Sequence, residues 1–454
     1  MIVFDYSNLL EENVKEQGLP ENFIHEYQGL IRGAHKALEE KGLPFIDTLY
    51  KNDYLASIKK FSNENKNRWE NLVIFGIGGS CLGALALHRA LNHPFHNLLD
   101  KKKRNGLPRA FFLDNIDPEL IFGLLETIDI KNTLFLVISK SGKTPETLAQ
   151  FLVALERLRN LDPKRQIIII TDPEKGPLRE ICKKEGYLSF PVPPALGGRY
   201  SVLSPVGLVP PSLLGVDIDA LILGAKEMVK RCKNNLEKSP ASIFALSHYL
   251  FNKRGKHIHV FMPYAHSLSG IAEWFCQLWA ESLGKRYNIK GEEVFYGPTP
   301  IKATGVTDQH SQLQLYMEGP YDKVITFLTV EDYRSKVSIP SFYPDIVDIS
   351  YLGNHSLNEL IKAEQIATEA ALTREKRPNA KLVLDEINAF NLGGLFILLE
   401  LATAIFGALC QIEPFNQPGV ELGKIYTHAL MGKPGFDKEK EGIEKFLKRS
   451  IYQV

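Results

Sequence analysis

The sequence predicts an α/β protein with two mostly parallel sheets, each covered by helices. Short apolar runs that suit buried strands alternate with segments that have helical periodicity or helix-start signals, over most of the 454 residues. A stretch rich in proline and glycine, residues 191–211, interrupts this alternation once. Because the chain is longer than one usual domain, we expect two α/β units that join near this stretch.

The first unit is predicted from apolar runs that follow a charged, helical opening ending near Trp69. These runs read as strands at residues 72–77, 109–113, 134–138 and 166–171. Helices are predicted to begin where a capping residue precedes a proline, at Asp117-Pro118, Thr144-Pro145 and Asp172-Pro173. Strand, turn and helix in this order indicate a parallel sheet that binds ligands at the carboxyl ends of its strands.

The second unit repeats the alternation without repeating the sequence. Its predicted elements are, in order, a helix at 240–253, a strand at 257–262, a helix at 268–283, a strand at 323–330, a helix at 357–374 and a strand at 382–384. We therefore expect a helical N-terminal extension over residues 1–70, domains over 71–211 and 212–413, and a C-terminal helical segment over 414–454.

The composition excludes several classes of protein. The chain carries 54 basic and 53 acidic residues, so it has no large field to attract nucleic acid or an anionic membrane. Its five cysteines show no Cys-x-x-Cys spacing, and the N-terminus does not resemble a secretory signal, so a cytoplasmic location is expected. Residues 392–412 are long and apolar enough to span a bilayer. Because Glu400 lies in their middle, we expect a buried helix instead.

Two strand-to-helix loops are suited to binding phosphate. Residues 76–80 read Gly-Ile-Gly-Gly-Ser, and glycines at such a place let backbone amides approach an anion at a helix N-terminus. A dinucleotide motif is incomplete here because Cys81 stands where its third glycine belongs, and a nucleotide P-loop ending at Gly142-Lys143-Thr144 is incomplete because Val137 stands at its first glycine.

Hydroxyl groups in the two loops favour a monophosphate. Ser80 lies in the first loop, and the second loop carries Ser139, Ser141 and Thr144. Hydroxyls and helix N-termini bind a dianion without the magnesium and lysine geometry used on a triphosphate. The alternative is that Ser80 and Thr144 only cap helices.

A carboxylate on an apolar helix face is the candidate general base. Helical spacing places Glu281 on the same face as Ile271, Trp274 and Leu278. Such a group could remove a proton from the carbon next to a carbonyl. The alternative is a surface pair between Glu281 and Lys285 at the end of the helix.

Three further candidates each have a structural alternative. His310 follows Thr307-Asp308 at an expected helix start, where it could exchange protons, but a lone histidine is often structural. Arg199 follows two glycines and could stabilise negative charge, or be a surface arginine. Lys424 could reach a substrate or only pair with Glu421. His257 and His259 share a strand face but have no third ligand nearby, so no metal is expected.

Taken together and in order, these segments resemble the glucose-6-phosphate isomerase family, in its shorter bacterial form. The segments that carry the resemblance are Gly-Ile-Gly-Gly-Ser at 76–80, Ser-Lys-Ser-Gly-Lys-Thr-Pro-Glu-Thr at 139–147, Gly-Gly-Arg-Tyr-Ser at 197–201, Glu-Ser-Leu-Gly-Lys at 281–285, Gln-His at 309–310 and Gly-Val-Glu-Leu-Gly-Lys at 419–424. Pro418 differs from the tryptophan of many relatives, and Gly142-Lys143 from the Phe-Thr of animal-type sequences.

The resemblance implies two sugar-isomerase (SIS) domains, each a five-stranded parallel sheet flanked by helices. It implies reversible conversion of glucose 6-phosphate to fructose 6-phosphate in glycolysis and gluconeogenesis, by ring opening and a cis-enediolate, with no cofactor and no metal. It also implies a homodimer in which His310 comes from the partner subunit, with no nucleic-acid or membrane partner.

The resemblance further implies a role for each site residue. Glu281 moves the proton between C1 and C2, Arg199 stabilises the enediolate, and His310 and Lys424 assist ring opening. The residues implied to bind substrate are Gly79, Ser80, Ser139, Lys140, Ser141, Thr144 and Gln417.

Two other functions are considered. A non-catalytic sugar-phosphate regulator on the same fold would need the phosphate loops but not the acid, base and arginine together. A glutamine-dependent amidotransferase would need a cysteine at its mature N-terminus, where this chain has Met1-Ile2. The full set of candidate residues favours the isomerase.

Overall fold

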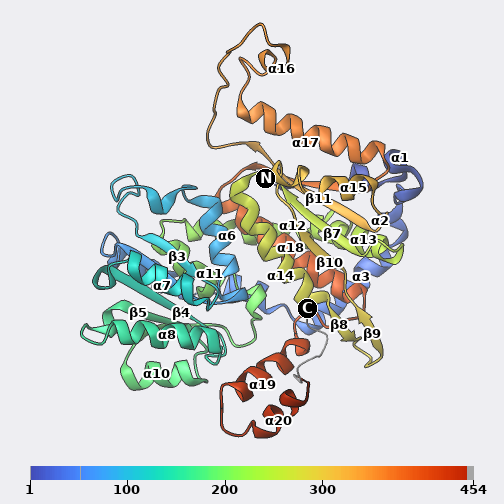
Figure 1. The fold of residues 1–454 in the computed structure, drawn as a ribbon. Helices are drawn as coiled ribbons and strands as arrows, with labels where there is room; N and C mark the ends of the chain where they lie inside the picture. The colour runs from blue at the N-terminus through green and yellow to red at the C-terminus, as the bar shows by residue number, and fades with distance from the viewer. Residues whose placement is uncertain (1, 52, 447–454) are drawn as a thin grey trace.

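Two five-stranded sheets form the centres of two lobes in the computed structural model, which describes residues 2–51 and 53–446 (Figure 1). The first sheet has the order β3-β2-β4-β5-β6, and all its strand pairs are parallel. Its strands are β2 (Asn71–Phe75), β3 (Arg109–Leu113), β4 (Thr133–Ile138), β5 (Ile167–Thr171) and β6 (Leu188–Pro191). The four strands predicted in this half are confirmed.

The fifth strand of the first sheet, β6, agrees with the five strands that the resemblance implies, although the apolar pattern did not locate it. It ends at Pro191, the first residue of the proline-rich stretch. Proline lacks the N–H needed inside a ladder but is tolerated at a sheet edge, which is where β6 lies.

The second sheet has the order β1-β12-β11-β7-β10 and is not wholly parallel. Its strands are β1 (Ile2–Asp5), β7 (Ile258–Pro263), β10 (Thr299–Lys302), β11 (Lys323–Asp332) and β12 (Asn379–Glu386). β1 pairs antiparallel to β12, so the expectations of a helical N-terminus and of a fully parallel sheet are wrong at this edge. Residues 2–5 form a strand because their burial alternates with the period of a strand: Ile2 and Phe4 are buried, while Val3 between them is exposed.

Most predicted helix starts agree with the structure. α7 (Pro118–Thr127) and α8 (Pro145–Arg157) begin at the predicted prolines, and α13 (Pro240–Lys253) and α17 (Leu357–Arg374) have the predicted bounds.

The helix predicted at Pro173 begins four residues later, as α10 (Pro177–Glu185). The reason is that the Asp172 carboxylate accepts the amide N–H groups of Glu174 and Lys175, which closes a local turn in place of a helix cap.

The long apolar segment forms the central core helix α18 (Ala389–Leu409). It packs against α12 (Ile218–Asn234), α13, α14 (Ser269–Leu283) and α3 (Gln28–Lys41). Its most apolar window is 89% buried inside the protein, as expected for a core helix.

The proline-rich stretch predicted as a junction is partly a buried helix, α11 (Pro205–Leu213). The predicted domain boundary at residue 211 therefore falls inside a helix. The other boundaries stay predictions.

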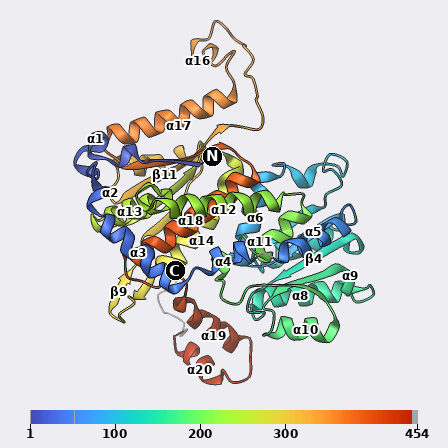
Figure 2. The same cartoon turned by 180° about the vertical axis from the view of Figure 1, so that it is seen from behind.

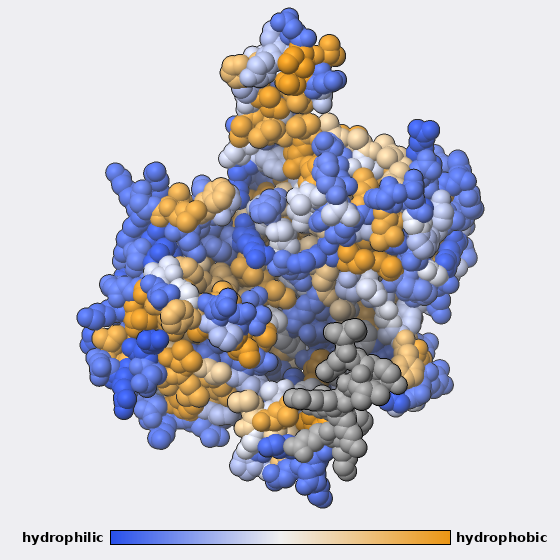
Figure 3. All heavy atoms as spheres, in the orientation of Figure 1, coloured by the Kyte–Doolittle hydropathy of each residue, from blue (hydrophilic) through white to orange (hydrophobic). Residues whose placement is uncertain are grey.

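Two segments project from the two lobes (Figures 1 and 2). One is an arm over residues 333–356 that contains α16 (Val347–Ser350) and leads into α17. Figure 3 shows apolar side chains on this arm. Those exposed to solvent include Val337, Phe342, Tyr343, Ile346, Val347, Ile349 and Tyr351. The other projection is the pair α19 (Glu421–Leu430) and α20 (Asp437–Phe446) near the C-terminus.

Candidate active site

The first glycine-rich loop packs directly against the turn that carries Arg199. A Cβ atom added at Gly79 would lie 2.3 Å from the carbonyl carbon of Gly198, so only glycine allows this approach of the two backbones. The Ser201 hydroxyl donates to the Gly198 carbonyl at 2.6 Å and also lies 3.4 Å from the Gly79 carbonyl. The turn is η6 (Gly198–Tyr200), and its contact with the loop brings the candidate phosphate site next to Arg199.

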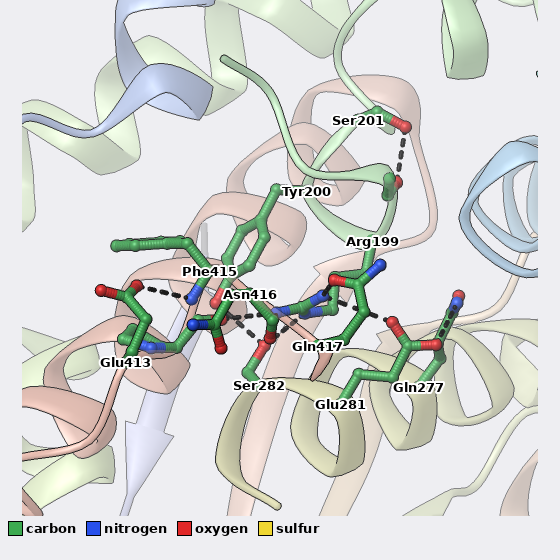
Figure 4. A network of polar contacts seen from close by, with 12 residues as sticks. Arg199, Tyr200, Ser201, Gln277, Glu281, Ser282, Glu413, Phe415, Asn416 and Gln417 are labelled. Atoms are coloured by element: carbon green, nitrogen blue, oxygen red, sulfur yellow. Dashed lines mark hydrogen bonds and ion pairs between the residues drawn. The ribbon is translucent and has the colours of Figure 1, made fainter. Parts of the chain in front are cut away.

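Arg199 is a buried cation whose N–H groups all have partners (Figure 4). Its side chain is 0% exposed. Nε donates to Ser282 at 2.7 Å, Nη1 to Gln417 at 2.5 Å and Glu281 at 3.3 Å, and Nη2 to the carbonyls of Pro414 at 2.6 Å and Asn416 at 3.1 Å. The expectation that Arg199 could be a surface residue is wrong, because its guanidinium links η6, α14 and the segment 414–417.

Glu281 lies on the last turns of α14 with its carboxylate partly open to solvent. Its side chain is 31% exposed, so it does not point into the core as its helix face suggested. One carboxylate oxygen contacts Arg199, and the other accepts the Gln277 amide N–H at 3.0 Å. Lys285 donates to the backbone carbonyl of Glu281, so the predicted side-chain ion pair is not formed. The carboxylate of Glu281 therefore contacts the buried guanidinium of Arg199 and is still accessible to solvent.

The hydroxyls of the two loops do not serve as helix caps. The cap of α6 (Leu82–Leu91) is Cys81, not Ser80. Thr144 occupies the cap position of α8, but its hydroxyl lies 2.8 Å from that of buried Ser139 and caps no amide. The capping alternative is therefore wrong for both residues.

The rest of the second loop adds a cation and a turn. Ser141 is exposed and accepts the Lys143 amide N–H at 3.2 Å. Gly142 has φ +64°, which favours glycine. Burial lowers the pKa of the Lys140 ammonium, and nearby Asp172 partly offsets this effect.

The structure does not bring His310 or Lys424 to Arg199 and Glu281. His310 is exposed at the end of η9 (Thr307–Gln309), ahead of α15 (Leu313–Glu318), and contacts neither residue within the part of the chain that the structure describes. Lys424, on α19, pairs with Glu421 at 2.7 Å, as its surface alternative predicted. Gln417 is the one residue predicted near the C-terminus that does reach the site.

The histidines on β7 and before it are engaged by protein groups. The Nε2 atom of buried His259 lies 3.0 Å from the Thr326 hydroxyl, and His257 Nδ1 lies 3.0 Å from the Asn252 amide. Among residues 2–51 and 53–446 no group of three His, Cys, Asp or Glu side chains is arranged to hold a metal ion.

Several residues of the site were not found from the sequence. Gln277 stands four residues before Glu281, so helical spacing could have indicated its contact with the carboxylate. Ser282 and Tyr200 lie in the quoted segments next to Glu281 and Arg199 but were given no role, and their hydroxyls lie 3.1 Å apart beside Arg199. Asn416 contributes through its backbone carbonyl, for which side-chain type gives no signal.

Comparison with known proteins identifies the family. The family model described as phosphoglucose isomerase matches residues 53–445. The chain belongs to the phosphoglucose isomerase family. Within that family it is 44% identical over 453 residues to the glucose-6-phosphate isomerase of Carboxydothermus hydrogenoformans, covering 98% of this chain and 97% of the relative. It is 43% identical over 441 residues to that of Rubrobacter xylanophilus, covering 96% and 99%.

Solved structures agree with membership of the phosphoglucose isomerase family. A hypothetical protein of Thermus thermophilus is 35% identical, with a TM-score of 0.83 over 95% of this chain and all of that protein. A glucose-6-phosphate isomerase of Chlamydia trachomatis shares the fold at 22% identity, with a TM-score of 0.73 over 86% of this chain and 76% of that one. The two-lobed α/β architecture is thus that of the family.

Proposed function

We propose that this chain catalyses the reversible isomerisation of glucose 6-phosphate and fructose 6-phosphate. The observation that carries the proposal is the contact between the accessible carboxylate of Glu281 and the fully buried guanidinium of Arg199, 3.3 Å apart. A base for the carbon-bound proton and a cation for the enediolate must lie side by side in this reaction. A sugar-phosphate sensor on the same fold would not need this pair. Membership of the family supports the same choice.

The phosphate end of the sugar is proposed to bind the two hydroxyl-bearing loops. The binding residues are Gly79, Ser80, Ser139, Lys140, Ser141 and Thr144. The observation that neither Ser80 nor Thr144 caps a helix supports this role. The Ser80 hydroxyl is left to donate to a ligand, and because Ser139 and Thr144 share one hydrogen bond, one of their two hydroxyl protons is also left for a ligand. No metal or organic cofactor enters the scheme.

In the proposed proton transfer Glu281 takes the proton from C2 of the open-chain aldose and returns it to C1. The electrons of the broken C–H bond form the C1–C2 double bond, and the π pair of the C1 carbonyl moves onto O1, which carries the negative charge of the enediolate. The ketose forms when the proton of the C2 hydroxyl moves to O1, the electrons left on O2 form the C2 carbonyl, and the C1–C2 π pair takes the proton back from Glu281 at C1. Every Arg199 N–H already has an acceptor, so a substrate oxygen must replace one of them. The Gln417 side-chain carbonyl is the acceptor that can swing away, because the others are a carboxylate, a buried serine and backbone.

His310 and Lys424 are proposed to assist ring opening in a homodimer, with His310 supplied across the interface. Two observations support this. Asp308 and Gln309 fix the loop beside His310, since Asp308 accepts the Thr304 amide at 2.7 Å and Gln309 bonds Tyr264 and Glu364, while His310 itself stays exposed. The arm at 333–356 exposes apolar side chains that a second subunit would cover (Figure 3).

Mixed dimers test whether His310 acts in trans. A Glu281→Gln chain and a His310→Ala chain are each expected to be nearly inactive. After unfolding and refolding together, hybrid dimers should regain activity, because one of their two sites then combines an intact Glu281 with an intact His310. Activity should follow the fraction of hybrids measured by native mass spectrometry. If hybrids form and stay as inactive as the parents, His310 acts within its own chain.

A Thr144→Val substitution is expected to raise KM for fructose 6-phosphate by about 10- to 100-fold, which corresponds to the loss of one hydrogen bond to a charged group. The kcat should change less than about threefold, because the phosphate interaction is made equally in the ground and transition states. Thr133→Val is the matched control and should leave KM unchanged, since the buried Thr133 hydroxyl lies at the amino end of β4, opposite the second loop, and bonds the Asp129 carbonyl and the Asn71 amide. An unchanged KM in Thr144→Val would remove this residue from the phosphate site.

A cytoplasmic location and the absence of nucleic-acid and membrane partners are part of the same proposal. The five cysteines are free thiols, as expected in a reducing compartment. The net charge of +1 offers no field for polyanions.

A further inference from the structure

Lys285 is a second buried cation beside the site, and it has no role in the scheme above. It is the first residue of β8 (Lys285–Tyr287), directly after α14, and it is 7% exposed. Its ammonium donates to the backbone carbonyl of Glu281 at 2.6 Å and to that of Asn416 at 2.9 Å. No carboxylate lies within ion-pair distance of it in the described part of the chain. A buried ammonium that bonds only carbonyls loses hydration free energy without gaining an ion pair. A lysine at this position therefore destabilises the fold, which favours a role for its charge at the site.

The two carbonyls bonded by Lys285 belong to the two segments that hold the candidate catalytic pair. Glu281 is the base itself. The carbonyl of Asn416 also accepts a hydrogen bond from Arg199 at 3.1 Å, so both cations share one acceptor. The segment that contains Asn416 also provides Pro414 and Gln417 to Arg199. Lys285 is therefore the direct tie between the last turn of α14 and the segment that fixes the guanidinium.

We propose that Lys285 is a positioning residue of the isomerase site, which fixes the carboxylate of Glu281 relative to the guanidinium of Arg199. The inference rests on the roles proposed above for these two residues. Without the tie, the hydrogen bonds that join the end of α14 to the segment 414–417 among the described residues would all pass through Arg199. A displacement of about 1 Å between reacting groups can cost about 10²-fold in rate.

The charge of Lys285 gives the inference a second readout. Burial and the neighbouring Arg199 lower the pKa of Lys285 to about 8, and Glu281 partly offsets them. The other ionisable groups near it are engaged elsewhere: Glu413 pairs with Lys41, and the hydroxyl of Tyr296, the strand partner of Lys285, donates to Asn252. Above pH 8 the neutral amine donates weaker hydrogen bonds to the two carbonyls and loses the positive charge close to the developing enediolate, so the tie and the charge weaken together.

Lys285→Met is expected to lower kcat by about 10- to 100-fold while KM changes less than about threefold, because the phosphate loops are untouched. Lys256→Met is the matched control. Lys256 is also buried, at 5% exposed, bonds Gln17 and Tyr321 at 2.6 and 2.9 Å, and has a pKa lowered to about 8, but it lies at the amino end of β7, away from the site. Both variants should lose a similar amount of thermal stability, and only Lys285→Met should lose kcat.

Lys285→Arg supplies the pH test. The wild-type kcat should fall as pH rises through about 8. Lys285→Arg should recover part of the activity lost in Lys285→Met. Its kcat should not show this fall at alkaline pH, which is the alkaline limb of the profile, because arginine stays charged. The inference is overturned if Lys285→Met retains kcat within twofold, if Lys256→Met loses as much kcat, or if Lys285→Arg shows the same limb. Failure of the proposed function is separate, because it would appear as no isomerisation by the folded wild-type protein. Failure of the proposed base would appear as full activity in Glu281→Gln.

Discussion

Glu281→Gln should lower kcat by about 10²- to 10⁴-fold, the usual contribution of a general base, and leave KM within about threefold. Glutamine has nearly the same shape, and it can still contact Gln277 and Arg199, so the fold and the phosphate loops are preserved. What it cannot do is accept the proton from C2. The measurement is conversion of fructose 6-phosphate to glucose 6-phosphate, followed with a coupled dehydrogenase.

The control for this variant lies on the same helix. Glu273, two turns before Glu281 on α14, bonds Arg89 at 2.8 Å and Lys302 at 2.9 Å, at the surface between the lobes. Glu273→Gln changes one carboxylate of α14 without touching the site and should keep kcat. Exchange of the C2 proton with solvent should disappear in Glu281→Gln and persist in Glu273→Gln. Normal turnover by Glu281→Gln would remove this residue from the role of base.

Arg199→Lys should lower kcat by about 10²- to 10³-fold and also lower the melting temperature. Lysine keeps the charge, but its three donors cannot replace the planar group that bonds Ser282, Gln417, Glu281 and two backbone carbonyls. Some of these buried acceptors are left without a donor, each at a cost of about 1–3 kcal/mol. Activity and thermal unfolding should therefore fall together in this variant.

Arg104→Lys separates the two effects. Arg104 is also buried, at 4% exposed, and it bonds backbone carbonyls of Leu99 and Leu107 and the carboxylate of Glu70, far from the site in the loop before β3. Its replacement should lower the melting temperature with kcat unchanged. If Arg199→Lys lost stability and kept its kcat, the stabilisation of the enediolate would have to come from another group.

The sequence was sufficient for the parts of the fold that have strong apolar patterns. Strands β2, β4 and β5 are buried along their whole length and were predicted within one or two residues. In the two five-stranded sheets, the strands that were missed are β1, β6 and β10. They are four-residue edge strands, whose short patterns cannot be told from loops without their partners.

Some residues of the candidate site were identified from the sequence and others were not. Arg199 and Glu281 were found as residues of distinct segments, and the structure brings them into contact across the two lobes. The carbonyls of Pro414 and Asn416 could not be found, because any residue type carries a backbone carbonyl. His310 and Lys424 lie apart from this pair in the structure, so their predicted roles stay predictions.

The antiparallel strand β1 sets a constraint on the order of assembly during synthesis. β1 leaves the ribosome before the other strands of the two sheets, yet its hydrogen-bond partner β12 is the last of these strands to be synthesised. The whole first sheet, from β2 to β6, is complete in sequence before any strand of the second sheet except β1 exists. The first lobe can thus fold early, while β1 remains unpaired until the second sheet has been synthesised. Contacts of this separation in sequence slow folding, so the docking of β1 is expected among the last steps, after β12 has been synthesised.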